Sequence, residues 1–281
     1  MEFKKLTGNI KIPVIGLGTW TIGGGNEADT TQDKEDISAI KSAIKFGITH
    51  IDTAESYAHG HSEDLIGKAI SRFDRKGLFI TSKVSPEHLA YGALLASAKG
   101  SLQRLRTDYI DLYLIHAPNP DISIQETMKA MDYLVEQKLV KCIGVSNFTV
   151  KQIKAAQKYT KNKIVANQIE YNLLVRNEGK VTNDMESTII PYCQGNNILV
   201  IAWRPLAKGE LAKPGFKILD ELARKYNKTQ AQIAINWLIS KKRIVTIKQS
   251  TKVGHLKENL GAIGWKLRQD DVDRLNNEFI G

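Results

Sequence analysis

The sequence predicts an α/β protein that folds as a single (β/α)8 barrel over residues 1–281, with an N-terminal β-hairpin and an extra C-terminal helix. From Val14 onward, short apolar runs alternate with longer helical patterns at a period of roughly 30 residues. Such alternation indicates a parallel sheet with helical crossovers. Eight repeats in 281 residues, with no Pro- or Gly-rich linker between them, favour a closed barrel over an open sheet.

Each element follows from local patterning. Residues 3–12 form two short alternating runs around a Thr7-Gly8-Asn9 turn, which is typical of a β-hairpin. Strands are expected at residues 14–18, 48–52, 78–83, 109–116, 140–146, 164–168, 198–203 and 244–247. Helices are expected at residues 34–46, 62–71, 87–105, 124–137, 150–159, 184–195, 219–226 and 230–240, then from Val253 and over 270–277.

Composition is that of an ordinary globular protein, with 42% hydrophobic and 25% charged residues. Cys142 and Cys193 lack metal-ligand spacing and are expected as two buried thiols in a reducing cytoplasm. We see no signal-peptide pattern and no apolar run near the roughly 18 to 20 residues of a membrane span. A cytoplasmic protein without a membrane partner is therefore expected.

The formal net charge of +10 would suit an anionic partner, either nucleic acid or a phosphorylated small molecule. The lysines are scattered along helices, as at Lys151, Lys154, Lys158 and Lys161, and no basic run is interleaved with aromatics. This distribution argues against nucleic acid and leaves a small molecule as the expected ligand.

Charged, polar or aromatic side chains that could take part in catalysis or binding lie at the predicted C-terminal ends of successive strands. They are Asp52, Lys83, His116, Ser146 with Asn147, Gln168, Trp203 and Lys248. In barrel enzymes these strand ends surround the active site. We therefore expect the site at this end of the barrel.

Tyr57, five residues after Asp52, is the candidate proton donor. A phenol with a pKa of about 10 is a poor acid at neutral pH and needs a nearby cation. Lys83 would supply it, with Asp52 as counter-ion, and this pair is expected to lower the pKa of Tyr57. His116 would hydrogen-bond the substrate oxygen. Taken singly, Asp52 could equally cap a helix and Tyr57 could pack at the barrel rim, but together the four suit protonation of a carbonyl oxygen.

The chain resembles the aldo-keto reductases nearly from end to end. The shared motifs are GLGTW from Gly16, DTAESY from Asp52, TSK ending at Lys83, IHAP from Ile115, GVSNF from Gly144, NQIEYN from Asn167, and Glu258-Asn259. The resemblance implies a hairpin that plugs the barrel bottom, a catalytic tetrad of Asp52, Tyr57, Lys83 and His116, and a nicotinamide coenzyme held without a Rossmann domain. Consistently, no strand is followed by G-x-G-x-x-G.

By the same resemblance, Ser146, Asn147 and Gln168 would hold the nicotinamide carboxamide, and Trp203 would stack on the ring unless it only caps the barrel core. The full set of expected coenzyme residues is Thr19, Trp20, Asp52, Ser146, Asn147, Gln168, Trp203, Arg204, Leu206, Lys248, Gln249, Ser250, Thr251, His255, Glu258 and Asn259. The expected substrate contacts are Trp20, Tyr57 and His116, and no metal is expected.

The phosphate end departs from the family pattern. Members that prefer NADP commonly carry a Pro-Lys-Ser stretch and an arginine ahead of the Glu-Asn pair, whereas this chain has Gln249 and His255 at the lysine and arginine positions. A neutral imidazole is a weak substitute for a guanidinium fork. We expect NADP(H) as the preferred coenzyme, bound through Ser250, Thr251, and Lys248 or Lys252, with NAD(H) also accepted.

The function expected is reversible reduction of an aldehyde or ketone by NAD(P)H, in a monomer or weak oligomer whose partner is a small carbonyl or alcohol. Three alternatives stay open. Lys83 could form a Schiff base in an aldolase. A metal hydrolase could be built on His50, Asp52, His59 and His61. The chain could also be a non-catalytic, coenzyme-binding regulatory subunit.

Overall fold

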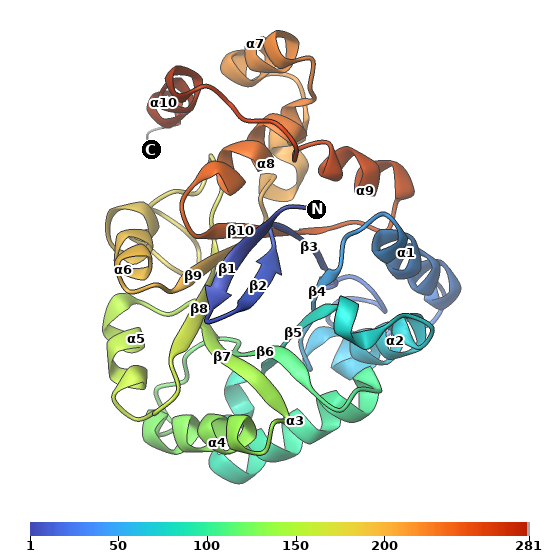
Figure 1. The fold of residues 1–281 in the computed structure, drawn as a ribbon, viewed down its shortest axis with the longest axis vertical. Coiled ribbons are helices and arrows are strands. Elements are labelled where there is room, and N and C mark those ends of the chain that lie inside the picture. The colour runs from blue at the N-terminus through green and yellow to red at the C-terminus, as the bar shows by residue number, and fades with distance from the viewer. Residues whose placement is uncertain (280–281) are drawn as a thin grey trace.

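A closed barrel of eight parallel strands forms the centre of the molecule. The computed structural model describes residues 1–279 and orders the strands β10-β3-β4-β5-β6-β7-β8-β9 around the barrel (Figure 1). Their bounds are β3 Ile15–Gly18, β4 His50–Asp52, β5 Phe79–Val84, β6 Ile110–Ile115, β7 Val140–Ser146, β8 Ile164–Glu170, β9 Leu199–Trp203 and β10 Ile244–Gln249. The predicted (β/α)8 fold, a TIM barrel, is confirmed.

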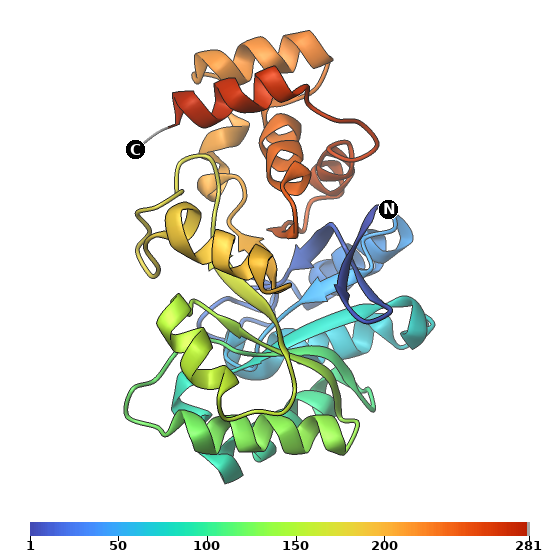
Figure 2. The ribbon, with the colours of Figure 1, turned by 60° about the vertical axis from the view of Figure 1, so that its left-hand side comes forward.

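Helices surround the barrel, because each crossover buries its apolar face against the sheet. They are α1 Asp33–Lys45, α2 His61–Ile70, α3 Tyr91–Leu105, α4 Ile124–Glu136, α5 Val150–Gln157, α6 Ile190–Gly195, α7 Lys217–Tyr226, α8 Gln230–Ser240, α9 Val253–Leu260 and α10 Gln269–Glu278. Helices α7 and α10 lie outside α8 and α9, at the top of Figure 2. Within residues 1–279, no helix is both long enough and apolar enough to cross a membrane.

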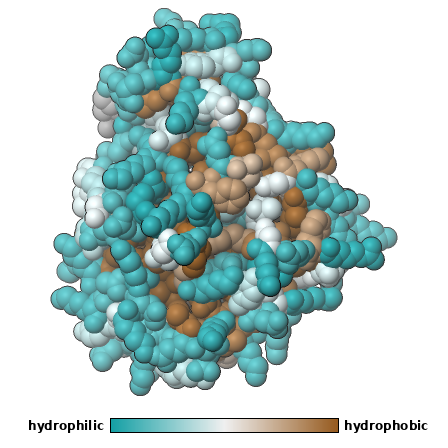
Figure 3. Space-filling model, viewed as in Figure 1, coloured by the Kyte–Doolittle hydropathy of each residue, from teal (hydrophilic) through white to brown (hydrophobic). Residues whose placement is uncertain are grey.

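The predicted hairpin is present as antiparallel β1 (Phe3–Thr7) and β2 (Ile10–Pro13), over the middle of the barrel in Figure 1. Lys4 Nζ donates hydrogen bonds to three carbonyl oxygens around the start of β10, those of Ile239, Lys241 and Ile244, at 2.5 to 2.7 Å. The hairpin therefore lies at the N-terminal end of the strands. In the same view, polar residues dominate the edges of this face and hydrophobic residues gather between them (Figure 3).

Several predicted boundaries differ from those observed, and three of the differences have a clear local cause. Helix α3 begins at Tyr91 rather than at residue 87, because Pro86–His88 form a separate 3-10 turn with proline in its first position. The helix expected over 184–195 divides into a π-helical turn, Met185–Ile189, and α6. Strand β10 extends to Gln249, because it stays paired with β3 as far as Gly18.

Strands β3 and β4 approach closely at Gly16 and His50. A Cβ added to Gly16 would lie 2.4 Å from His50 Nδ1, so only glycine fits. The imidazole is fully buried, and its Nε2 lies 3.1 Å from Thr81 Oγ1. Burial lowers the pKa of His50 to about 4, so this ring is a neutral part of the barrel core directly below the strand ends.

Candidate active site

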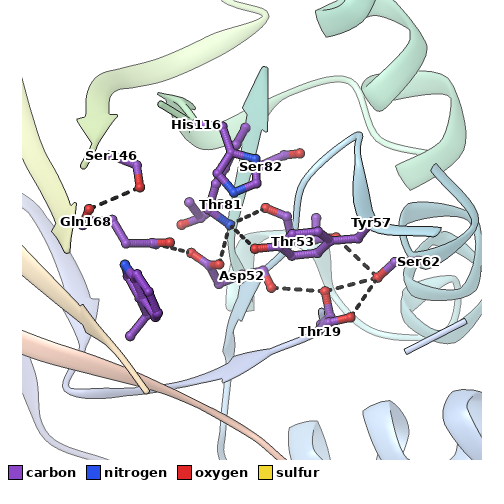
Figure 4. A network of polar contacts seen from close by, with 12 residues as sticks. Thr19, Asp52, Thr53, Tyr57, Ser62, Thr81, Ser82, His116, Ser146 and Gln168 are labelled. Carbon is purple, nitrogen blue, oxygen red and sulfur yellow. Dashed lines mark hydrogen bonds and ion pairs between the residues drawn. The ribbon is translucent and has the colours of Figure 1, made fainter. Parts of the chain in front are cut away.

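Lys83 is the centre of a buried polar network at the C-terminal ends of β4 and β5. Its Nζ donates to Asp52 Oδ1 at 2.6 Å and to the carbonyl oxygen of Thr53 at 2.7 Å. It also lies 3.2 Å from Tyr57 OH. Lys83 has no exposed surface and Asp52 is 1% exposed. The predicted grouping of Asp52, Lys83 and Tyr57 is therefore what the structure shows, and Figure 4 shows Asp52 and Tyr57 within it.

Backbone contacts fix the turn that carries Tyr57. The amide of Glu55 donates to the Lys83 carbonyl oxygen at 3.2 Å, which ties the turn to β5. Ala58 then donates to the carbonyl oxygen of Gly25 at 2.6 Å. Ala58 and His59 both adopt left-handed backbone angles in the 3-10 segment Tyr57–Gly60, which reverses the chain before α2. The phenol is thereby held over Lys83, whose Nζ lies 4.9 Å from the ring centroid.

The charge state of this network differs from the sequence-based expectation. Burial raises the pKa of Tyr57, and Lys83 opposes this shift without overcoming it. Burial alone would lower the pKa of Lys83, but Asp52 and Tyr57 together outweigh it, so the pKa of Lys83 is raised. At neutral pH the site therefore holds an ammonium, paired with Asp52, beside a phenol that keeps its proton.

His116 follows β6 directly and faces Tyr57. The two ring centroids lie 5.6 Å apart in an edge-to-face arrangement. Burial, reinforced by the charge of Lys83, lowers the pKa of His116 to about 3, so the imidazole is neutral at physiological pH. Its Nδ1 lies 3.4 Å from Ser56 Oγ. A neutral imidazole has one N–H to donate, and if the Ser56 hydroxyl donates to Nδ1, that N–H is on Nε2.

Amide and hydroxyl groups occupy the ends of β7 and β8. Ser146 Oγ donates to the carbonyl oxygen of Gln168 at 3.0 Å, and Gln168 Nε2 donates to Asp52 Oδ2 at 2.7 Å (Figure 4). Asn147 has a left-handed backbone, and its Nδ2 lies 3.1 Å from Ser146 Oγ. Trp203 Nε1 donates to Asn147 Oδ1 at 3.3 Å, which fixes the indole plane. Hydrogen bonds therefore connect the Ser146, Asn147 and Trp203 side chains to one another and to the backbone of Gln168, at the strand ends where the sequence placed these residues.

A cavity of about 950 Å³ opens over the network. Most predicted site residues line it: Thr19, Trp20, Asp52, Tyr57, His116, Ser146, Asn147, Gln168, Trp203, Arg204, Leu206, Lys248 and Gln249. Arg204 lies over the Trp203 ring, with its guanidinium carbon 4.8 Å from the ring centroid. Lys248 Nζ donates to the Gln249 carbonyl oxygen at 3.1 Å, and burial lowers the pKa of Lys248.

The other predicted coenzyme residues lie beyond this lining, at the end of β10 and on α9. They are Ser250, Thr251, His255, Glu258 and Asn259. Ser250 is buried, and its Oγ accepts a hydrogen bond from the Lys252 amide at 3.2 Å, so this hydroxyl shapes the entry to α9. Thr251 and His255 are exposed near the N-terminus of that helix.

Several lining residues were not predicted, namely Gly18, Asn26, Glu27, Ser56, His59, Pro205 and Ile247. Ser56 could have been found from its place beside Tyr57. Asn26 and Glu27 belong to the irregular segment between β3 and α1 and carry no motif. Lys208, which follows Trp203 by five residues and could from the sequence either face a phosphate group or stay in solvent, also lines the cavity.

The histidines proposed for a metal hydrolase are held apart by other partners. His61 Nε2 lies 2.7 Å from Asp33, and His59 Nε2 lies 3.2 Å from Glu27. His50 is buried against Thr81. No group of three or more His, Cys, Asp or Glu side chains within residues 1–279 is arranged to hold a metal ion.

Curated relatives match the chain over nearly its whole length. A glyoxal reductase of Bacillus subtilis (strain 168) is 35% identical over 274 residues, covering 97% of this chain and 91% of the relative. The methylglyoxal reductase YeaE of Escherichia coli (strain K12) is 30% identical over 279 residues, covering 98% of this chain and 94% of the relative.

Solved structures are also similar to this chain over nearly its whole length. A thermostable aldo-keto reductase in complex with the inhibitor epalrestat superposes with a TM-score of 0.93 at 42% identity, covering 99% of this chain and 100% of that chain. An aldo/keto reductase of Klebsiella pneumoniae, in complex with NADP and acetate, gives a TM-score of 0.86 at 31% identity, covering 96% of this chain and 92% of that chain. The family model for aldo/keto reductases matches residues 14–278. With this match and these relatives, the chain belongs to the aldo/keto reductase family.

Proposed function

We propose that this enzyme reversibly reduces small aldehydes and ketones to alcohols, with NADPH as hydride donor and Tyr57 as proton donor. The observation that supports it most directly is the contact of 3.2 Å between Lys83 Nζ and Tyr57 OH, above a buried ion pair with Asp52. This arrangement favours proton transfer to an oxygen that gains negative charge in the cavity.

The proton chemistry follows from the charge states of the chain's own residues. The raised pKa of Tyr57 keeps the phenol protonated, and hence ready to donate, at neutral pH. The ammonium of Lys83 stabilises the phenolate that donation leaves behind. In the reverse direction, that phenolate accepts the alcohol proton. A reduced nicotinamide supplies the hydride when it is bound.

His116 orients the carbonyl in this proposal. Since its pKa is about 3, the ring is a neutral hydrogen-bond donor and not an acid at physiological pH. The His116 ring packs edge-to-face on Tyr57, which would direct the imidazole N–H and the Tyr57 hydroxyl to the same substrate oxygen.

The cavity suits a nicotinamide coenzyme. A primary amide needs both donors and acceptors, which Ser146, Asn147 and Gln168 provide, and the fixed face of Trp203 suits stacking on the ring. Cations at Arg204, Lys208 and Lys248 line the same cavity and would attract phosphates. The Klebsiella relative solved with NADP supports NADP(H) as the preferred coenzyme. We infer that NAD(H) is also used, because Gln249 and His255 stand at the usual cationic positions.

The substrate class proposed is small carbonyls, including α-dicarbonyls. The relatives named as glyoxal and methylglyoxal reductases support this choice. Trp20, which is 44% exposed at the cavity, would form one wall of the substrate site.

Tyr57→Phe tests the proposal, because it removes the phenolic hydroxyl and leaves the ring in place. We expect kcat for methylglyoxal reduction to fall by at least about a hundredfold. NADPH binding, followed by quenching of tryptophan fluorescence, should be preserved. Retained turnover would reject Tyr57 as the proton donor, and an inactive wild type that still binds NADPH would indicate a regulatory coenzyme-binding subunit.

Coenzyme choice is tested by comparing kcat/KM for NADPH and NADH in wild type, Lys248→Ala and His255→Ala. We expect a modest NADPH preference that Lys248→Ala reduces most, because the Lys248 side chain lines the cavity and His255 lies beyond that lining. A strong preference lost only in His255→Ala would show that the imidazole recognises the phosphate.

The aldolase alternative is disfavoured by the state of Lys83. A Schiff-base lysine must lose its proton, whereas burial here is outweighed by Asp52 and Tyr57 and the pKa of Lys83 is raised. Borohydride in the presence of a carbonyl substrate should therefore leave Lys83 unmodified, as shown by peptide mass.

A further inference from the structure

Gln168 connects the coenzyme side of the cavity to the catalytic ion pair. Its Nε2 donates to Asp52 Oδ2 at 2.7 Å, while the other oxygen of that carboxylate accepts from Lys83 at 2.6 Å (Figure 4). From this geometry we infer that Gln168 is a positioning residue for proton transfer, acting through Asp52, in addition to the coenzyme contact proposed for it. The inference rests on the proposed function.

Burial makes this hydrogen bond important for the carboxylate. Gln168 is 3% exposed and Asp52 is 1% exposed, so water has little access to Oδ2. A buried carboxylate oxygen without a donor is costly, and the carboxylate would turn or draw Lys83 away to satisfy it. With Gln168 on Oδ2, Oδ1 is left for Lys83, and Lys83 remains within 3.2 Å of Tyr57 OH.

The orientation of the Gln168 amide follows from its partner. An ionised carboxylate only accepts hydrogen bonds, so the NH₂ group of Gln168 must face Asp52. The amide oxygen then makes no hydrogen bond to the part of the chain that the structure describes, and Gln168 lines the cavity. One side chain can therefore accept from a carboxamide N–H while it continues to donate to Asp52. Binding at one end strengthens donation at the other, because hydrogen bonds in a chain polarise one another.

A double-mutant cycle tests whether Gln168 acts through Asp52. Gln168→Met keeps the length of the side chain and removes the amide. At saturating NADPH, we expect it to lower kcat about tenfold in the wild-type background, on the scale of a hydrogen bond to a charged group. In the Asp52→Ala background, which lacks the carboxylate, the same change should lower kcat by no more than about twofold.

Asn147→Ala is the matched control, because Asn147 belongs to the same group of amides but does not contact Asp52. We expect it to raise the KM for NADPH, and to affect kcat by the same factor in both backgrounds. Gln168→Glu provides a second signature, since a protonated glutamic acid can donate to Asp52 and a glutamate cannot. Its kcat should recover toward wild type as the pH falls, and that of Gln168→Met should not.

The inference would be overturned if Gln168→Met lowered kcat equally in both backgrounds, or changed only the KM for NADPH. That result would leave the proposed function standing, because wild-type reduction and its loss in Tyr57→Phe are measured separately. Folding of each variant is checked by far-UV circular dichroism and by quenching of tryptophan fluorescence by NADPH.

Discussion

The ion pair between Lys83 and Asp52 contributes to stability as well as to chemistry. Both side chains are almost fully removed from water, so each depends on the other for compensation of its charge. Replacing one partner by a neutral residue leaves the other as an uncompensated buried charge. Replacing both by neutral residues leaves no buried charge, and only their hydrogen bonds are lost.

We therefore predict that Lys83→Met lowers the free energy of unfolding by about 3–5 kcal/mol. Adding Asp52→Asn should recover more than half of that loss without restoring carbonyl reduction. Urea unfolding monitored by circular dichroism measures the first effect, and NADPH oxidation measures the second. If the double variant were as unstable as Lys83→Met alone, the lost stability would come from packing and not from charge.

At the scale of elements, the approach of β3 to β4 depends on the absence of a side chain at Gly16. The His50 ring is fully buried, hydrogen-bonds Thr81 and packs edge-to-face on Phe79, with ring centroids 5.4 Å apart, so these contacts oppose its displacement. Gly18, two residues along the same strand, is different: a Cβ there would meet its nearest atom at an ordinary 3.6 Å.

Gly16→Ala should therefore lower the free energy of unfolding by about 1–3 kcal/mol, the usual cost of overpacking. Gly18→Ala is the matched control and should cost less than Gly16→Ala in the same denaturant titration. Equal losses at the two positions would mean that strand conformation, rather than contact with His50, requires glycine.

At the scale of the whole molecule, the two ends of the barrel have separate tasks. Lys4 binds the hairpin to three carbonyl oxygens at the N-terminal end, and the cavity lies at the other end. Burial lowers the pKa of Lys4 to about 8, so at neutral pH the Lys4 side chain is still protonated in most molecules.

Lys4→Ala should lower the free energy of unfolding by about 1–3 kcal/mol, because it leaves buried carbonyl oxygens without their donor. We expect kcat to stay within about twofold of wild type, since stability-determining contacts at the bottom of such barrels are remote from the chemistry. Lys5→Ala, in the next residue, is the control; Lys5 is exposed and should change neither quantity. A large loss of kcat in Lys4→Ala would show that the two ends are coupled.

The sequence was sufficient to predict the barrel and the convergence of Asp52, Tyr57, Lys83 and His116 at one end of it, because apolar runs define strands and strand ends converge at one face. It could not predict the direction of the Tyr57 pKa shift, since that depends on how much water the folded site excludes. Nor could it predict the bond between Gln168 and Asp52, which joins residues 116 positions apart and depends on strand register around the barrel. Glu27 and His59 reach the cavity from irregular segments without periodicity.

The packed interior of the barrel also determines how ligands move. Side chains fill the space below the strand ends, so the cavity is a cup closed at its floor, and everything that enters at the rim must leave there. Gln168, 3% exposed, lies at the floor of the cup, whereas Trp20, 44% exposed, stands at its rim. We therefore expect a ligand that contacts the floor to bind before a ligand that rests against Trp20, and to leave after it.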